Sequence, residues 1–71
     1  MTLIEIAKIY TELVELERQV PEEEYRAKDM LNSMRTKYHE QLMAKMREDG
    51  MIFSDRFDAA NKAFELISQN S

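Results

Sequence analysis

The chain has 71 residues, of which 44% are hydrophobic and 34% are charged, and this composition is typical of one small folded domain. It has no cysteine and one histidine, which excludes a disulfide framework and disfavours a zinc site. One glycine and one proline are too few turn residues for a β-rich fold. No apolar run approaches the roughly 18 residues of a membrane span, and Glu5 argues against a secretory signal peptide. We therefore predict a single all-α domain over residues 1–71, cytoplasmic and without a cofactor or metal.

Charge is unevenly distributed within the net value of −4. Residues 1–24 carry seven glutamates against Lys8 and Arg18, whereas residues 25–47 carry six cations against Asp29 and Glu40. We interpret this contrast as an acidic first helix packed beside a basic second helix. A nucleic-acid surface is the alternative, but the cations are spread around the predicted second helix, and phosphate contacts need them on one side.

The first helix is predicted over residues 3–19. Thr2 and Glu5 form a capping-box pattern at its start. Apolar residues then recur at three- and four-residue steps, which is typical of an amphipathic helix: they are Leu3, Ile6, Ile9, Tyr10, Leu13, Val14, Leu16 and Val20.

The second helix is predicted over residues 21–49, with Pro21 in the first position and three glutamates in the first turn. Gly50 is expected to end it in the left-handed conformation. Since Pro21 disfavours helical dihedral angles at Val20, a short break joins the two helices as an antiparallel hairpin; a kinked continuous helix is the alternative. The residues expected to face the core are Ala27, Met30, Leu31, Met34, Tyr38 and Leu42.

The third helix is predicted over residues 55–68, with Ser54 as its N-cap. Phe57, Ala60, Phe64 and Ile67 mark one apolar face. Two layouts fit the three lengths: a compact bundle, or helices one and three placed end to end along helix two. The second layout leaves apolar surface open, and such patches mark interaction sites. We expect the bundle-like fold to be completed by self-association as a dimer.

Six residues are the apolar positions least explained by one core, and we predict that they contact a partner: Tyr25, Met43, Met46, Met51, Ile52 and Phe53. Methionine is common on surfaces that accept varied partners. His39 has no acidic or ligating neighbour one turn away, so we expect it to face solvent. The consecutive residues Glu22–Glu24 point in different directions on a helix and do not converge on one substrate atom. We therefore predict no enzyme activity.

The segment Gly50-Met51-Ile52-Phe53-Ser54-Asp55-Arg56-Phe57-Asp58 resembles a stretch of the theta subunit of bacterial DNA polymerase III. That family is one of small helical accessory proteins that bind the proofreading subunit. The resemblance covers nine residues, and the family continues with further helical sequence where this chain stops. It assigns no residue a role.

These patterns favour a non-enzymatic helical module, a small adaptor, regulator or inhibitor that docks on a larger bacterial or phage protein. The alternatives are a nucleic-acid-associated factor using Arg26, Lys28, Arg35 and Lys37, or a structural subunit of a larger assembly. We expect no small-molecule substrate and no membrane contact.

Overall fold

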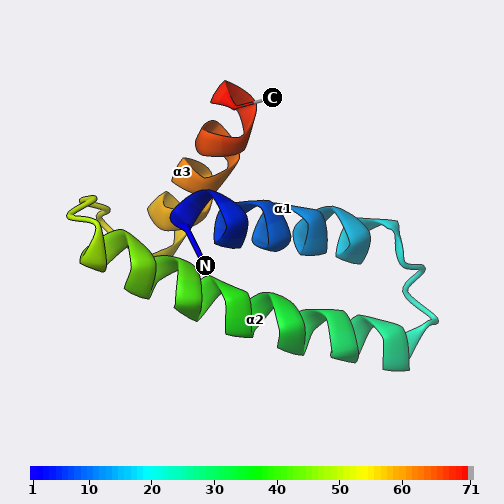
Figure 1. Ribbon diagram of the computed structural model, residues 1–71. Coiled ribbons are helices and arrows are strands. Elements are labelled where there is room, and N and C mark those ends of the chain that lie inside the picture. The colour runs from blue at the N-terminus through cyan, green and yellow to red at the C-terminus, as the bar shows by residue number, and fades with distance from the viewer. Residues whose placement is uncertain (71) are drawn as a thin grey trace.

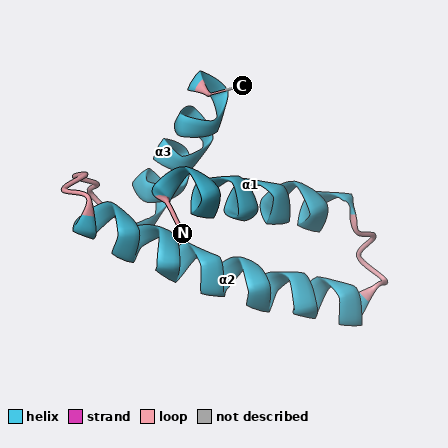
Figure 2. Cartoon of the chain, viewed as in Figure 1, coloured by secondary structure: helices cyan, strands magenta, loops and turns pink. Residues whose placement is uncertain are grey.

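The computed structural model describes residues 1–70, and every regular element in that range is a helix (Figures 1 and 2). Helix α1 spans Leu3–Gln19, α2 spans Tyr25–Glu48 and α3 spans Arg56–Gln69. The prediction of an all-α chain with three helices is confirmed. The molecule measures 40 × 23 × 22 Å.

Helix α1 begins and ends where the sequence indicates. The Glu5 backbone N–H donates to the Thr2 hydroxyl at 3.2 Å, and the Thr2 backbone N–H donates to the Glu5 carboxylate at 2.9 Å. This reciprocal pair satisfies two of the N–H groups that a helix start leaves free. At the other end Val20 is extended, with φ −81° and ψ 127°, as the following proline requires.

Helix α2 begins four residues later than predicted. Residues 21–24 form a turn in which the Glu24 N–H donates to the Pro21 carbonyl at 3.0 Å, and the helix starts at Tyr25 without a side-chain cap. Packed helices lie 8–10 Å apart, so a break of one residue is too short to bring α2 back alongside α1. The turn supplies the missing length, and the chain forms a hairpin rather than a kinked helix (Figure 1).

Gly50 ends α2 in the left-handed conformation, with φ +77°. Its N–H donates to the Arg47 carbonyl at 3.1 Å, and the Met51 N–H donates to the Met46 carbonyl at 2.8 Å. This pair of bonds is a Schellman motif, which satisfies carbonyls that the helix end would leave free. Helix α3 then begins after Asp55, whose carboxylate accepts from the Asp58 N–H at 2.8 Å. The N-cap is therefore Asp55 and not Ser54.

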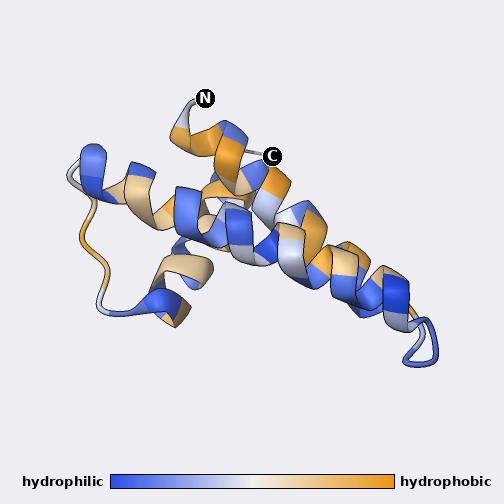
Figure 3. Cartoon of the chain, turned by 90° about the horizontal axis from the view of Figure 1, so that it is seen from below, coloured by the Kyte–Doolittle hydropathy of each residue, from blue (hydrophilic) through white to orange (hydrophobic). Residues whose placement is uncertain are grey.

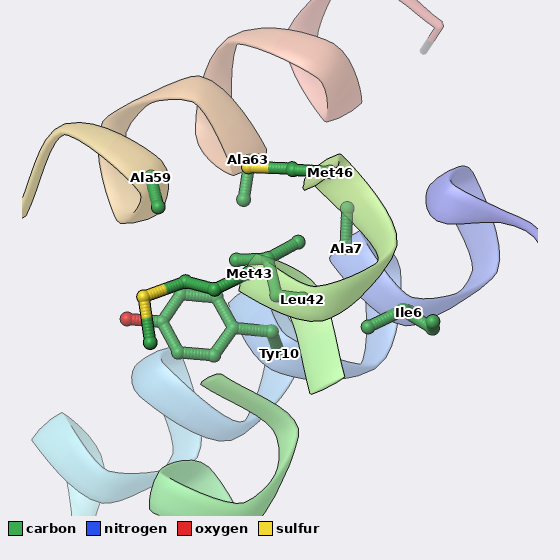
Figure 4. Packing of buried hydrophobic residues seen from close by; sticks show 8 residues of the cluster. All are labelled: Ile6, Ala7, Tyr10, Leu42, Met43, Met46, Ala59 and Ala63. Atoms are coloured by element: carbon green, nitrogen blue, oxygen red, sulfur yellow. The ribbon is translucent and has the colours of Figure 1, made fainter. Parts of the chain in front are cut away.

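Helix α3 crosses the hairpin steeply near the N-terminal half of α1 and the C-terminal half of α2 (Figure 1). It therefore shares a core with both helices, unlike the end-to-end layout, but it does not run alongside them. Alanines at the crossing allow this close approach, because interaxial distance depends on the side chains between the helices. The buried cluster in Figure 4 consists of Ile6, Ala7, Tyr10, Leu42, Met43, Met46, Ala59 and Ala63.

The buried face of α2 is rotated from the predicted one. Met30 and Met34 are exposed, whereas His39, Met43 and Met46 are buried. The expectation that Met30 and Met34 face the core is wrong, and so is the expectation that His39 faces solvent. The reason is that two helices pack on α2: α1 meets one side of its buried face and α3 meets the other.

Candidate functional site

One ion pair crosses the seam between the two long helices. The Arg35 Nε atom donates to the Glu17 carboxylate at 2.6 Å, and both side chains are about three-quarters buried. Around this pair, Arg18 and Lys28 line a hollow of about 320 Å³ together with Tyr10 and Val14. This side of the hairpin is therefore charged.

The same ion pair defines what lies on the opposite side. Each residue step turns a helix by about 100°. In an antiparallel pair, the residues that precede Glu17 and Arg35 lie on one side of the seam, and the residues that follow lie on the other. The preceding residues are Leu16 and Met34, and the following ones are Arg18 and Thr36. The seam thus separates a charged side from an apolar side.

Extending this count along both helices gives a continuous apolar strip, which we call the hairpin face. Leu16 is 50% exposed and Met34 is 41% exposed, whereas Leu13 is buried and the others are half-buried. Met30, more exposed still, lies at its edge. In Figure 3 hydrophobic residues occur along the hairpin, whereas the connection at its far end is hydrophilic. The hairpin face consists of Ile9, Leu13, Leu16, Val20, Ala27, Leu31, Met34 and Tyr38.

Helix α3 does not cover the hairpin face. It contacts the hairpin through residues on the charged side of the seam, including Ala7, His39 and Met43, and it approaches the hairpin face at Leu16, which lines one groove with Phe64 and Ile67. In the view of Figure 1, α3 passes behind α1. Within residues 1–70, therefore, the hairpin face has no third layer.

The six residues predicted to contact a partner do not form one surface. Met43 and Met46 are 8% and 0% exposed and belong to the core cluster, so the prediction that they lie at the surface is wrong. The Schellman turn sends the chain into α3, which then covers both side chains. Met51 and Phe53 are half-buried against the same cluster.

Tyr25 and Ile52 are the two members of the set that lie fully at the surface, at 75% and 87% exposed. Tyr25 is the first residue of α2 and Ile52 lies beyond its last residue, and at 24 residues the helix is about 36 Å long. They therefore cannot belong to one small site, although each stays a candidate contact on its own. The hairpin face was missed because its residues were assigned to the core; the signal was present as the apolar stripes of both helices.

His39 is the polar side chain that links all three helices. It is 4% exposed, its Nε2 donates to the Arg56 carbonyl at 2.9 Å, and its ring lies 5.0 Å from the Tyr10 ring. Burial raises the pKa of the Tyr10 hydroxyl, and the nearby Arg35 partly opposes that shift. This arrangement joins the helices to one another, and nothing in it converges on an open cavity.

No three histidine, aspartate or glutamate side chains among residues 1–70 are placed to hold a metal ion. In the same range, no helix combines the length and the apolar character needed to cross a membrane.

No protein-family model, curated protein or solved structure matches the chain. The resemblance to the theta subunit therefore rests on residues 50–58 alone. In the structure this segment is the connection between α2 and α3, which contains the Gly50 turn and the Asp55 cap.

Proposed function

We propose that this protein is a non-enzymatic helical module that docks on a larger protein through the hairpin face. The observation that carries the proposal is the uncovered apolar strip centred on Leu16 and Met34. Contiguous exposed apolar surface of this kind marks protein-interaction sites. The exposed methionines Met30 and Met34 suit such a surface, because methionine adapts to the shape of a partner.

The size of the hairpin is adequate for a specific interface. The long side of the molecule measures 40 × 23 Å, and a standard interface covers about 800 Å² on each partner. The charged side is a poorer candidate, since Arg35 and Lys28 are already paired with Glu17 and Glu22. The same pairing weakens the case for a nucleic-acid-associated factor, because two of its four proposed cations are engaged.

Self-association through the hairpin face is the second candidate. Two copies would cover each other's apolar strips, and an isologous contact of this type closes as a dimer. The face has the required self-complementary apolar character at Leu16 and Met34. We rank it below docking on a larger protein, because α1, α2 and α3 already share a core within one chain.

The test compares three forms of the chain: wild type, Met34→Glu and Thr36→Glu. Both changes place a carboxylate at an exposed position of α2, but Thr36 lies on the charged side of the seam. Each form is immobilised and exposed to a lysate of the native host, and captured proteins are identified by mass spectrometry. We expect one protein to be retained by wild type and Thr36→Glu and lost with Met34→Glu, because charges are depleted at interface cores.

Sedimentation of the purified chain separates the two candidates. A dimer that Met34→Glu dissociates and Thr36→Glu does not would establish self-association instead. Equal capture by all three forms, with no dimer, would show that the hairpin face binds nothing and would overturn both.

A further inference from the structure

A second surface lies where α3 rises away from α1, in the angle between the two helices that Figure 1 shows. It is a groove of about 470 Å³, which is within the range of pockets that hold ligand groups. Its apolar walls come from Leu16 on α1 and from Phe64 and Ile67 on α3. A separate, smaller hollow shares Thr11, Glu12 and Ile67 with the groove, and Lys8 lines that hollow.

Acidic side chains border the groove. Glu12 and Glu15 line it, and no lysine or arginine does. Glu15 is paired with the exposed Arg18 at 3.2 Å, whereas Glu12 makes no ion pair within residues 1–70. The buried Thr11 hydroxyl donates to the Lys8 carbonyl at 3.1 Å, so its hydrogen-bond donor is already used within the chain. The groove thus combines an apolar interior with two carboxylates and no lysine or arginine in its lining.

We infer that this groove binds a basic amphipathic helix of a partner protein. One or two of its aliphatic or aromatic side chains enter between Leu16, Phe64 and Ile67, and its lysines or arginines lie beside Glu12 and Glu15. Helix-in-groove binding uses apolar anchors one turn apart, and complementary charges at the rim set the orientation and the choice of partner. An acidic or neutral helix would leave Glu12 without a counter-charge.

The groove is distinct from the hairpin face. The two surfaces share Leu16, but Phe64 and Ile67 belong to α3 and are not part of the hairpin face. The inference therefore does not rest on the function proposed above, because the groove needs Phe64 and Ile67, which the hairpin face does not contain.

The experiment uses a fluorescent peptide of about 15 residues with leucines along one helical face and lysines along its edges. A second peptide carries glutamate in place of every lysine. Binding to the full chain is measured by fluorescence anisotropy at fixed ionic strength. The decisive variant is Glu12→Gln/Glu15→Gln, and the matched control is Glu22→Gln/Glu23→Gln, which removes the same charge from the α1–α2 connection.

We expect the basic peptide to bind and the acidic one not to bind. The Glu12→Gln/Glu15→Gln variant should bind about five- to tenfold more weakly, and the control should stay within about twofold of wild type. Ile67→Gln should also weaken binding, with a melt recorded to show that the chain remains folded. Amide shifts on peptide addition should centre on Thr11, Glu12 and Ile67.

Equal losses in the two double variants would mean that net charge alone attracts the peptide, and would overturn the inference. Amide shifts centred on Leu31, Met34 and Tyr38 would also overturn the inference, because they would show that the peptide binds to the hairpin face instead. If neither peptide bound, the inference that the groove binds a basic helix would be refuted, and the capture result for Met34→Glu would be unaffected.

Discussion

The Nε2 atom of His39 lies 2.9 Å from the backbone carbonyl oxygen of Arg56, and this hydrogen bond joins the middle of α2 to the first turn of α3. On its other side the His39 ring contacts Tyr10 of α1. Replacing His39 with alanine should lower the free energy of unfolding by about 2–3 kcal/mol, from one hydrogen bond and the lost packing.

The measurement is urea unfolding followed by circular dichroism. His39→Gln keeps a side-chain donor and should recover part of the loss. The exposed change Thr36→Ala should cost less than about 0.5 kcal/mol. Equal stabilities for the histidine and threonine variants would mean that His39 does not hold α3 in place.

Met46 and Met30 give opposite predictions for the same substitution in one helix. Met46 is fully buried beside Ala63, so Met46→Glu buries a carboxylate without a partner and should cost several kcal/mol or unfold the chain. Met30 is 64% exposed, so Met30→Glu should leave the melting temperature nearly unchanged. The measurement is a thermal melt of each variant at one protein concentration. If Met46→Glu stayed folded and Met30→Glu unfolded, the buried face of α2 would be the one that carries Met30 and not the one that carries Met46.

Gly50 should tolerate asparagine better than alanine. A Cβ at this position would meet no atom within 4 Å, so the cost arises from the backbone, which has φ +77°. Alanine in this conformation costs about 1–2 kcal/mol, whereas asparagine adopts it more readily. Urea midpoints for Gly50→Ala and Gly50→Asn test this order, and identical midpoints would show that α2 ends without the left-handed turn.

Acid should weaken the start of α3 through Asp58. Lys62 donates to both carboxylate oxygens, at 3.0 and 2.9 Å, and the Ser54 N–H donates at 2.9 Å. The bonds from Lys62, and then that from Ser54, lower the pKa of Asp58 below its ordinary value. Because the folded pKa is the lower one, the stabilisation is present above the unfolded pKa and is lost as pH falls through the folded pKa.

The urea midpoint should therefore fall as pH drops below about 4, and Asp58→Asn should show a smaller fall than wild type. Ionic strength is held constant throughout. Glu23 makes no ion pair or side-chain hydrogen bond within residues 1–70, so Glu23→Gln serves as the control and should follow wild type. If the urea midpoint of Asp58→Asn fell with pH as steeply as that of wild type, the acid sensitivity would arise from other groups.

Local signals in the sequence were sufficient for the helix ends that depend on nearby residues. The capping box at Thr2 and Glu5, the extended Val20 before Pro21 and the Gly50 turn all involve groups within five residues of one another. The predicted start of α2 is wrong because the true start depends on how far the chain must extend to return alongside α1, and no local sequence pattern contains that distance.

The predicted buried face of α2 is wrong for a related reason. Hydrophobicity alone placed Arg35 and His39 away from the core, yet both are on the buried side. Glu17 pairs with Arg35, and the Arg56 carbonyl accepts from His39 Nε2, whereas His39 Nδ1 is buried without a hydrogen-bond partner within residues 1–70. Those partners are 18 and 17 residues distant in the sequence. Helical spacing did identify the apolar stripe of Ala27, Leu31, Met34 and Tyr38, but it could not tell a core from a surface that α3 leaves uncovered.

The support that α3 gives to only one end of the hairpin has a consequence for motion. The other end carries the residue 20–24 connection and the first turn of α2, which has no side-chain cap. Backbone amides there should exchange with solvent by local opening, while those around Leu42 and Met46 exchange only through global unfolding. Since Val20 and Ala27 of the hairpin face lie in the opening region, a bound partner would slow amide exchange most at the end farthest from α3.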